Sequence, residues 1–254
     1  PLTIQTAMRK EVKHLYINAV ELIVHGLNLH RHDIFTTKDI AATVAASRSP
    51  VEFDIDERYE QRVKTLHSAI VEFTTRINTK DMAENVVEDI YTLRDVATGI
   101  VRAVKAIKHL RRNATHFTER GQGVVTDLYN GLRTEIARIL VEIRKLELAD
   151  PEDRSSLWLD QERIQVENDA QNTNGRIEAL IRDQKLAVGA ATSFLNDSNY
   201  AYSAMRELLD AARAYYIETE DGMAEVERIL SLEDDELSDV GKAGPSRNAS
   251  EGAS

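Results

Sequence analysis

Apolar residues recur every three or four positions along most of the chain, with polar residues between them. The first such row reads Met8, Val12, Leu15, Ala19 and Leu22. This spacing puts the apolar side chains on one face of an α-helix, and no row shows the two-residue alternation of a strand. Similar rows span residues 8–29, 59–77, 86–107, 125–146, 166–180 and 194–215. The pattern predicts an all-α fold of six long amphipathic helices.

Proline and polar residues mark the connections between these rows. All four prolines lie outside the rows, where a missing backbone N–H breaks no helix. We expect a long polar loop over residues 31–56 and tight turns at 78–80 and 149–151. Asp150 should cap the fifth helix, with Pro151 at the first helical position.

The glycine pair at Gly121 and Gly123 separates the third helix from the fourth. The pair lacks the third glycine of a dinucleotide-binding turn and no strand precedes it, so it is interpreted as a helix break. We predict two tandem three-helix bundles, residues 1–116 and 117–232, whose helices cross nearly antiparallel at about 20°. Residues 233–254, which are acidic and then rich in Ser, Gly and Ala, are expected to be disordered.

Composition narrows the function classes. Lys and Arg total 32 against 43 Asp and Glu, and the net charge of −11 argues against a nucleic-acid partner. Cysteine is absent from the sequence, which excludes disulfides and thiolate chemistry and fits a reducing compartment. No window approaches the roughly 18 to 20 uncharged apolar residues that cross a bilayer. We therefore expect a soluble chain.

Histidine and carboxylate spacings offer few metal sites. Glu11-x-x-His14 suits a carboxylate di-iron bundle, but such a bundle needs this motif on two helices, so His14 is interpreted as a helix-surface residue. His30 and His32 form a His-x-His pair. They fall where the first helix is expected to end, and cations there interact favourably with the terminal carbonyls.

Lys105, Lys108, Arg111 and Arg112 form a basic run near the expected end of the third helix. The run could meet an anionic membrane surface or a phosphate, but complementarity with the helix dipole is the favoured interpretation. No set of Ser, His and Asp appears in an order that nominates a nucleophile. We expect no enzymatic activity.

The segment over residues 191–202 carries Ser, Asn and Asp inside a long helical pattern. These residues disfavour helix interiors because their side chains compete for backbone hydrogen bonds, so other groups should hold them. One alternative is a ligand or metal site. The other, which is favoured because buried polar groups usually satisfy one another, is an interhelical network. Its predicted partners on the fifth helix are Asn168, Asp169, Asn172 and Asn174.

This segment, with residues 177–182 before it, resembles the PhoU-like cytoplasmic C-terminal domain of bacterial sodium/phosphate cotransporters. The likeness runs from the first helix to about Glu218, and the three-plus-three helix order is also that of PhoU. It implies a regulatory domain on the cytoplasmic side of the inner membrane. The implied partner is the membrane domain of a phosphate transporter, in the same polypeptide or an adjacent protein. Other regulatory proteins and a homo-oligomer would also be compatible.

PhoU proteins often carry Glu-x-x-x-Asp on the third helix of each repeat, where clustered carboxylates bind metal ions. Asp95 and Asp197 match the aspartate, but Tyr91 and Ser193 stand where the resemblance would place glutamate. Both departures remove an oxygen ligand, so we expect no bound metal and no cofactor. The candidate polar or regulatory site comprises Asp95, Asn196, Asp197, Ser198 and Asn199.

Three functions stay open on the sequence. The leading one is a regulatory domain that docks helical faces to a phosphate transporter or to partner proteins. The second is a metal sensor or metal-dependent enzyme that uses Glu88, Asp95 and Asp197. The third is a structural bundle that oligomerises through leftover apolar stripes.

Overall fold

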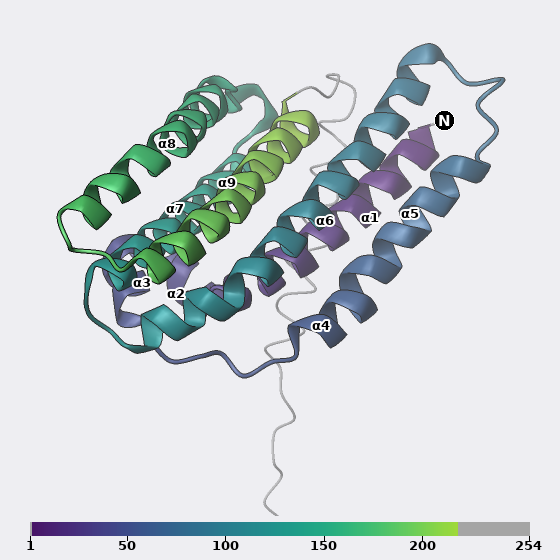
Figure 1. The fold of residues 1–254 in the computed structure, drawn as a ribbon. Coiled ribbons are helices and arrows are strands. Elements are labelled where there is room, and N and C mark those ends of the chain that lie inside the picture. The colour runs from purple at the N-terminus through teal and green to yellow at the C-terminus, as the bar shows by residue number, and fades with distance from the viewer. Residues whose placement is uncertain (1, 218–254) are drawn as a thin grey trace, which may run out of the picture. The chain divides into compact units, whose positions relative to one another are not determined.

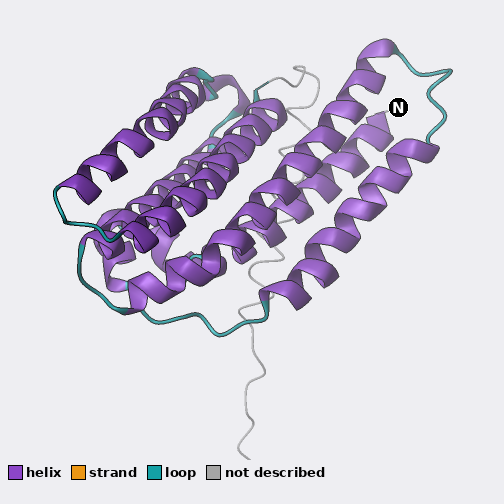
Figure 2. Cartoon of the chain, in the orientation of Figure 1, coloured by secondary structure: helices purple, strands orange, loops and turns teal. Residues whose placement is uncertain are grey.

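The computed structural model describes residues 2–217, and every regular element in this range is helical (Figure 2). The predicted all-α class is therefore confirmed. The long helices are α1 (Leu2–Gly26), α6 (Glu84–Glu119), α7 (Val124–Leu148), α8 (Leu157–Arg182) and α9 (Val188–Tyr216). The shorter ones are α2 (Arg31–Thr36), α3 (Ile40–Ala46), α4 (Ile55–Arg58) and α5 (Thr65–Arg76). The tail at 233–254 lies outside the described residues.

Helices α6 and α9 lie side by side at the centre of the fold (Figure 1). Helices α1 and α5 pack against α6, whereas α7 and α8 pack against α9, and the short helices α2 and α3 contact α7. The two central helices approach closely at Gly99, where a Cβ atom would lie 3.0 Å from Glu207 Oε2. Within the described range, no helix is both long enough and apolar enough to cross a bilayer.

The predicted apolar rows form most of the core. All five residues of the first row are buried on α1, and α6 and α9 bury their rows in the same way. The second predicted row, over residues 59–77, departs from the structure at Phe73, which is 43% exposed, while Thr74 beside it is 3% exposed. A π-helical turn over Tyr59–Lys64 precedes α5. Ile70 is buried as predicted, and Thr74, four residues later on the same helix face, takes the next inward position.

The long loop predicted over residues 31–56 is wrong, because this stretch contains α2 and α3. Asp39 caps α3 by accepting from the backbone N–H of Ala42 at 2.9 Å. The two helices have six and seven residues and each buries one apolar side chain, Ile34 or Val44. Helices this short complete too few turns to produce a visible period.

The other predicted boundaries have mixed outcomes. Gly121 and Gly123 adopt positive φ angles of 75° and 113°, which confirms the helix break. Helix α6 continues to Glu119, past the expected boundary at residue 116. Asp150 makes no side-chain capping bond, and Pro151 begins a short 3₁₀ turn instead of α8, so that predicted cap is wrong.

Candidate functional site

Asp197 and Ser198 are the buried members of the polar segment on α9, with 1% and 2% of their surface exposed. Asp197 Oδ2 accepts hydrogen bonds from Tyr129 Oη of α7 at 2.6 Å and from Asn113 Nδ2 of α6 at 2.9 Å. Ser198 Oγ donates to the carbonyl of Leu195 in its own helix at 2.9 Å. One carboxylate therefore fastens α9 to both α6 and α7.

Aromatic rings pack around Tyr129, the donor to this carboxylate. Its ring stacks on Phe117 with 5.2 Å between centroids and meets Phe194 edge-on at 5.4 Å. Burial raises the pKa of Asp197 above its ordinary value, and the bonds from Tyr129 and Asn113 oppose this with a smaller effect. Burial also raises the pKa of the Tyr129 hydroxyl. The arrangement suits helix anchoring better than metal binding, which needs several oxygen donors.

The partners of this network are not those that the sequence suggested. Asp169 accepts from Gln165 Nε2 of its own helix at 3.0 Å. A buried polar link from α8 to α9 joins Thr173 Oγ1 and Tyr202 Oη at 2.8 Å. Helix α8 turns its other predicted partners toward solvent, because its single buried stripe faces α9. These exposed residues are Asn168, Asn172 and Asn174.

The remaining candidate residues lie on the surface. The Asp95 side chain is 70% exposed and contacts Arg94 Nη2 at 3.1 Å on α6. Asn196 and Asn199 are exposed on α9. Of the five candidates, Asp197 and Ser198 are buried, but Ser198 bonds within its own helix and does not join the Asp197 network. The two aspartates matched by the resemblance therefore differ in environment, one buried and one in solvent.

The histidine pairs do not assemble a metal centre. Glu11 Oε2 and His14 Nδ1 are 3.8 Å apart on α1, a separation too long for a hydrogen bond. Helix α1 ends at Gly26, and His30 directly precedes α2, so the predicted role of His30 and His32 at a helix end is wrong. Among the described residues, no group of three or more His, Cys, Asp or Glu is placed to hold a metal ion.

The basic run lies in the interior of α6, so the interpretation as helix-dipole complementarity is wrong for it. The dipole acts within the last turn, and α6 continues to Glu119. Lys108 Nζ pairs with Asp56 Oδ1 at 2.6 Å. Arg111 Nη2 donates to the carbonyl of Val51 at 3.3 Å. These two cations fasten the segment before α5 onto α6.

Sequence reasoning missed a buried arginine on α7. Arg133 is 1% exposed, and its guanidinium uses all five N–H donors on neutral oxygens. Burial lowers its pKa to about 10. The acceptors lie at the ends of α1 and α3 and within α7, and they are the carbonyls of Leu27, Asn28, Val44 and Ser47 and the Oδ1 atom of Asn130.

A pattern in the sequence could have revealed this arginine. A second buried stripe runs along α7 beside the predicted apolar row, so this helix is covered on two faces. The stripe keeps the spacing of three and four, but it mixes polar with apolar side chains and is invisible to a count of apolar residues. Its members are Thr126, Tyr129, Arg133, Ala137 and Leu140.

A cleft of about 220 Å³ opens between α7, α8 and α9. Its apolar lining comes from all three helices and comprises Leu128, Leu132, Val166, Ile177, Phe194 and Met205. Its polar lining comprises Asp127, Glu135, Glu162, Asp169, Thr173, Arg176 and Tyr202, and Gly131 completes the wall. The cleft exists because α7 and α8 each pack on α9 while making little backbone contact with each other.

Arg138 joins the two sides of this cleft. Its guanidinium donates to Glu135 Oε2 at 2.7 Å on α7 and to both carboxylate oxygens of Glu162 on α8. The bonds to Glu162 are the main reason why the pKa of Arg138 is raised. Glu162 is 7% exposed, so this ion pair is a partly buried bridge between two helices that otherwise stand apart.

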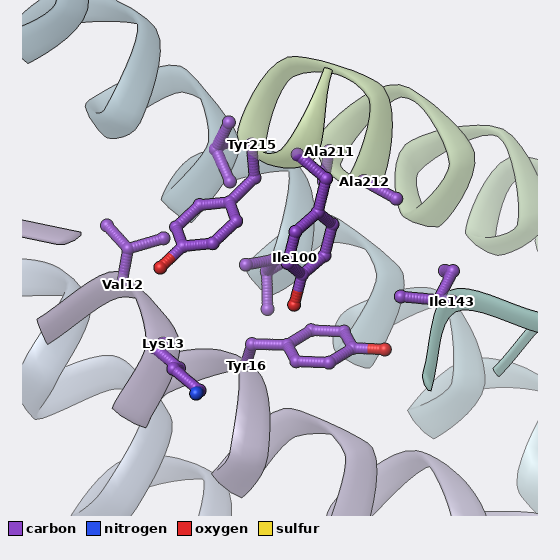
Figure 3. Close-up of a pocket in the computed structure, with 10 residues that line it drawn as sticks. Val12, Lys13, Tyr16, Ile100, Ile143, Ala211, Ala212 and Tyr215 are labelled. Carbon is purple, nitrogen blue, oxygen red and sulfur yellow. The ribbon is translucent and has the colours of Figure 1, made fainter. Parts of the chain in front are cut away.

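A second, smaller cavity of about 20 Å³ lies between α1, α6, α7 and α9 (Figure 3). Val12, Ile100 and Ile143 contribute apolar lining, and the rings of Tyr16 and Tyr215 lie beside it. Burial raises the pKa of the Tyr16 hydroxyl. A space of this size holds about one water molecule, so the cavity is a packing gap and not a ligand site.

Comparisons of the chain with protein-family models, with curated proteins and with solved structures found no significant match.

Proposed function

We propose that this chain is a PhoU-like regulatory domain of a sodium-dependent phosphate transporter, and that it docks helical faces to the membrane domain or to regulatory proteins. The observation that carries the proposal is the segment over residues 191–202, which resembles the corresponding segment of such domains. The helix order supports it. Helices α1, α5 and α6 and helices α7, α8 and α9 are taken as two tandem three-helix bundles on the cytoplasmic side of the inner membrane.

Regulation in this proposal depends on the interface between α6 and α9. Asp197 accepts hydrogen bonds from Asn113 of α6 and Tyr129 of α7, so any shift of α9 against these helices would lengthen or break those bonds. A partner that prefers one packing of these helices shifts the population toward it. The transporter domain would respond to that packing through the helical face that docks to it, and Asp197 would take part in no chemical reaction.

The proposal is tested by sodium-dependent uptake of labelled phosphate in cells that produce the intact transporter. Deletion of the region should change uptake, and Tyr129→Phe, which removes one donor to Asp197, should shift it in the same direction. Glu178→Gln is the control, because this exposed carboxylate of α8 lies outside the network and should leave uptake unchanged. Unchanged uptake after deletion, with no hydrophobic spans encoded before Pro1, would refute the proposal.

A structural, oligomerising bundle is the second candidate, because apolar side chains are exposed at the end of α7 and near the start of α8. Leu148, Leu157 and Ile164 are 69%, 63% and 62% exposed. Leu157 and Ile164 are seven residues apart and share one face of the helix. If this face mediates self-association, light scattering will show a dimer that Ile164→Glu converts to monomer. A monomer at every concentration would remove this candidate.

The metal-dependent alternative has no supporting group of ligands in the described part of the chain. Its test is elemental analysis of protein purified without chelator. Stoichiometric Fe, Mn, Zn or Mg would revive it.

A further inference from the structure

The cleft between α7, α8 and α9 combines an apolar lining with carboxylates, and this combination limits what it can bind. Among the lining residues, four are carboxylates and one is an arginine. An anionic ligand would meet more negative than positive charge there. An uncharged apolar ligand would cover those carboxylates of the lining that have no basic partner without supplying one. An amphipathic cation satisfies both parts of the lining.

The carboxylates of the cleft are not equally engaged. Glu135 and Glu162 are held by Arg138, whereas Asp169 accepts from the neutral amide of Gln165. The carboxylate of Asp127, an exposed residue, makes no hydrogen bond or ion pair with any residue that the structure describes. Asp127 on α7 and Asp169 on α8 are therefore the two carboxylates that lack a basic partner within the described range. They line the cleft from two different helices.

Gly131 provides an observation that is independent of charge. It lies in the interior of α7, where glycine disfavours the helix relative to alanine. A Cβ atom built on it would meet no other atom within 4 Å, so internal packing does not require glycine here. Gly131 lines the cleft, and the missing side chain keeps that wall open down to the backbone.

The size of the cleft sets the size of the ligand. Its volume of about 220 Å³ is below the roughly 300 Å³ at which pockets begin to take drug-sized molecules. A short alkyl chain fits this space. The rings of Phe194 and Tyr202 in the lining add aromatic surface, which attracts alkylammonium groups.

We infer that this cleft binds a small aliphatic diammonium ion, whose alkyl stem packs on the apolar lining while its two ammonium groups meet Asp127 and Asp169. The inference does not depend on the proposed function. It assigns a free small molecule as the ligand, because the space is too small for a helix of a partner protein.

The test uses 1,4-diaminobutane as the probe and 1,4-butanediol, which has the same length without charge, as its control. Titration calorimetry of the full chain should give saturable binding of the diamine and no binding of the diol. Methyl-labelled methionine provides a local readout, because Met205 lines the cleft and Met8 lies in the core of α1. The Met205 methyl resonance, assigned with Met205→Leu, should shift with the diamine while that of Met8 does not.

Two variants with matched controls locate the site. Gly131→Leu should fill the cleft and abolish binding, whereas Gly175→Leu, at a glycine of α8 with equally open surroundings outside the lining, should not change it. Asp169→Asn should weaken binding about tenfold by removing a charge-assisted hydrogen bond. Glu178→Gln, the control on the same helix, should leave the affinity unchanged.

Several outcomes would overturn the inference. Diamine heats that are the same in Gly131→Leu and the unaltered chain would mean diffuse attraction to an acidic protein. An unshifted Met205 resonance would mean the same. Binding of a lysine-containing peptide without binding of the diamine would assign the cleft to a protein partner. If Gly131→Leu fails to fold by circular dichroism, Asp169→Asn and the Met205 shift still decide the question.

Discussion

Arg133 holds the ends of two other helices through one side chain. Removing it would leave several buried carbonyls without donors, and each unsatisfied group costs about 1–3 kcal/mol. We expect Arg133→Met to lower the free energy of unfolding by about 3 kcal/mol or more, measured by urea denaturation. The control is Arg112→Met on exposed α6 surface, which should change it by less than about 0.5 kcal/mol. Equal effects of the two variants would show that the hydrogen bonds of Arg133 stabilise the fold no more than an exposed arginine does.

Asp197 should make stability depend on pH. Its folded pKa is raised above the unfolded value near 3.8 by burial, so the native state binds more protons than the unfolded state between the two values. The free energy of unfolding should therefore fall as pH rises through that window and stay low above it. Asp197→Asn keeps an acceptor for both donors but cannot titrate.

The measurement for Asp197 is urea unfolding of both proteins over a pH series. The stability of the unaltered chain minus that of Asp197→Asn should decrease from about pH 3.8 upward and then level off. A difference that increases with pH would show that the bonds from Tyr129 and Asn113 outweigh burial.

At the scale of elements, glycines in α1 and α7 predict opposite effects of the same substitution. Gly131→Ala should raise the free energy of unfolding by about 0.5–1 kcal/mol, because the methyl group enters open space and alanine favours the helix. Gly26→Ala should lower it by about 1–3 kcal/mol, since its Cβ would lie 2.8 Å from Ile107 Cγ2. Thermal unfolding of both variants checks the pair. Changes of the same sign in the free energy of unfolding would show that the surroundings of Gly26 or Gly131 differ from those described.

The long helices could be predicted from the sequence because their apolar rows extend over many turns. The elements that the sequence did not predict are those without such rows, namely α2, α3 and the π-turn before α5. For the candidate site, polar residues inside a helical pattern drew attention to residues 191–202. Their partners could not be predicted, since Asn113 and Tyr129 are 84 and 68 residues away from Asp197.

At the scale of the molecule, residues 2–217 are tied together across the boundary that the sequence placed near residue 116. Helix α6 packs along α9, and Arg133 binds carbonyls of α1 and α3. A fragment of residues 1–122 would lack all of these contacts and expose the apolar face of α6. We expect it to unfold without a cooperative urea transition, whereas the chain 1–217 unfolds cooperatively. A cooperative transition of the fragment would establish residues 1–116 as an autonomous domain.

The distance in sequence between Arg133 and its acceptors bears on how the protein emerges from the ribosome. Leu27 is made 106 residues before the guanidinium that satisfies its carbonyl. At about 5–20 residues per second, this end of the nascent helix lacks its hydrogen-bond donor for on the order of 5–20 seconds of translation. During that interval the amino-terminal third is a natural client for chaperones, and arrest before α7 would release a product open to proteolysis.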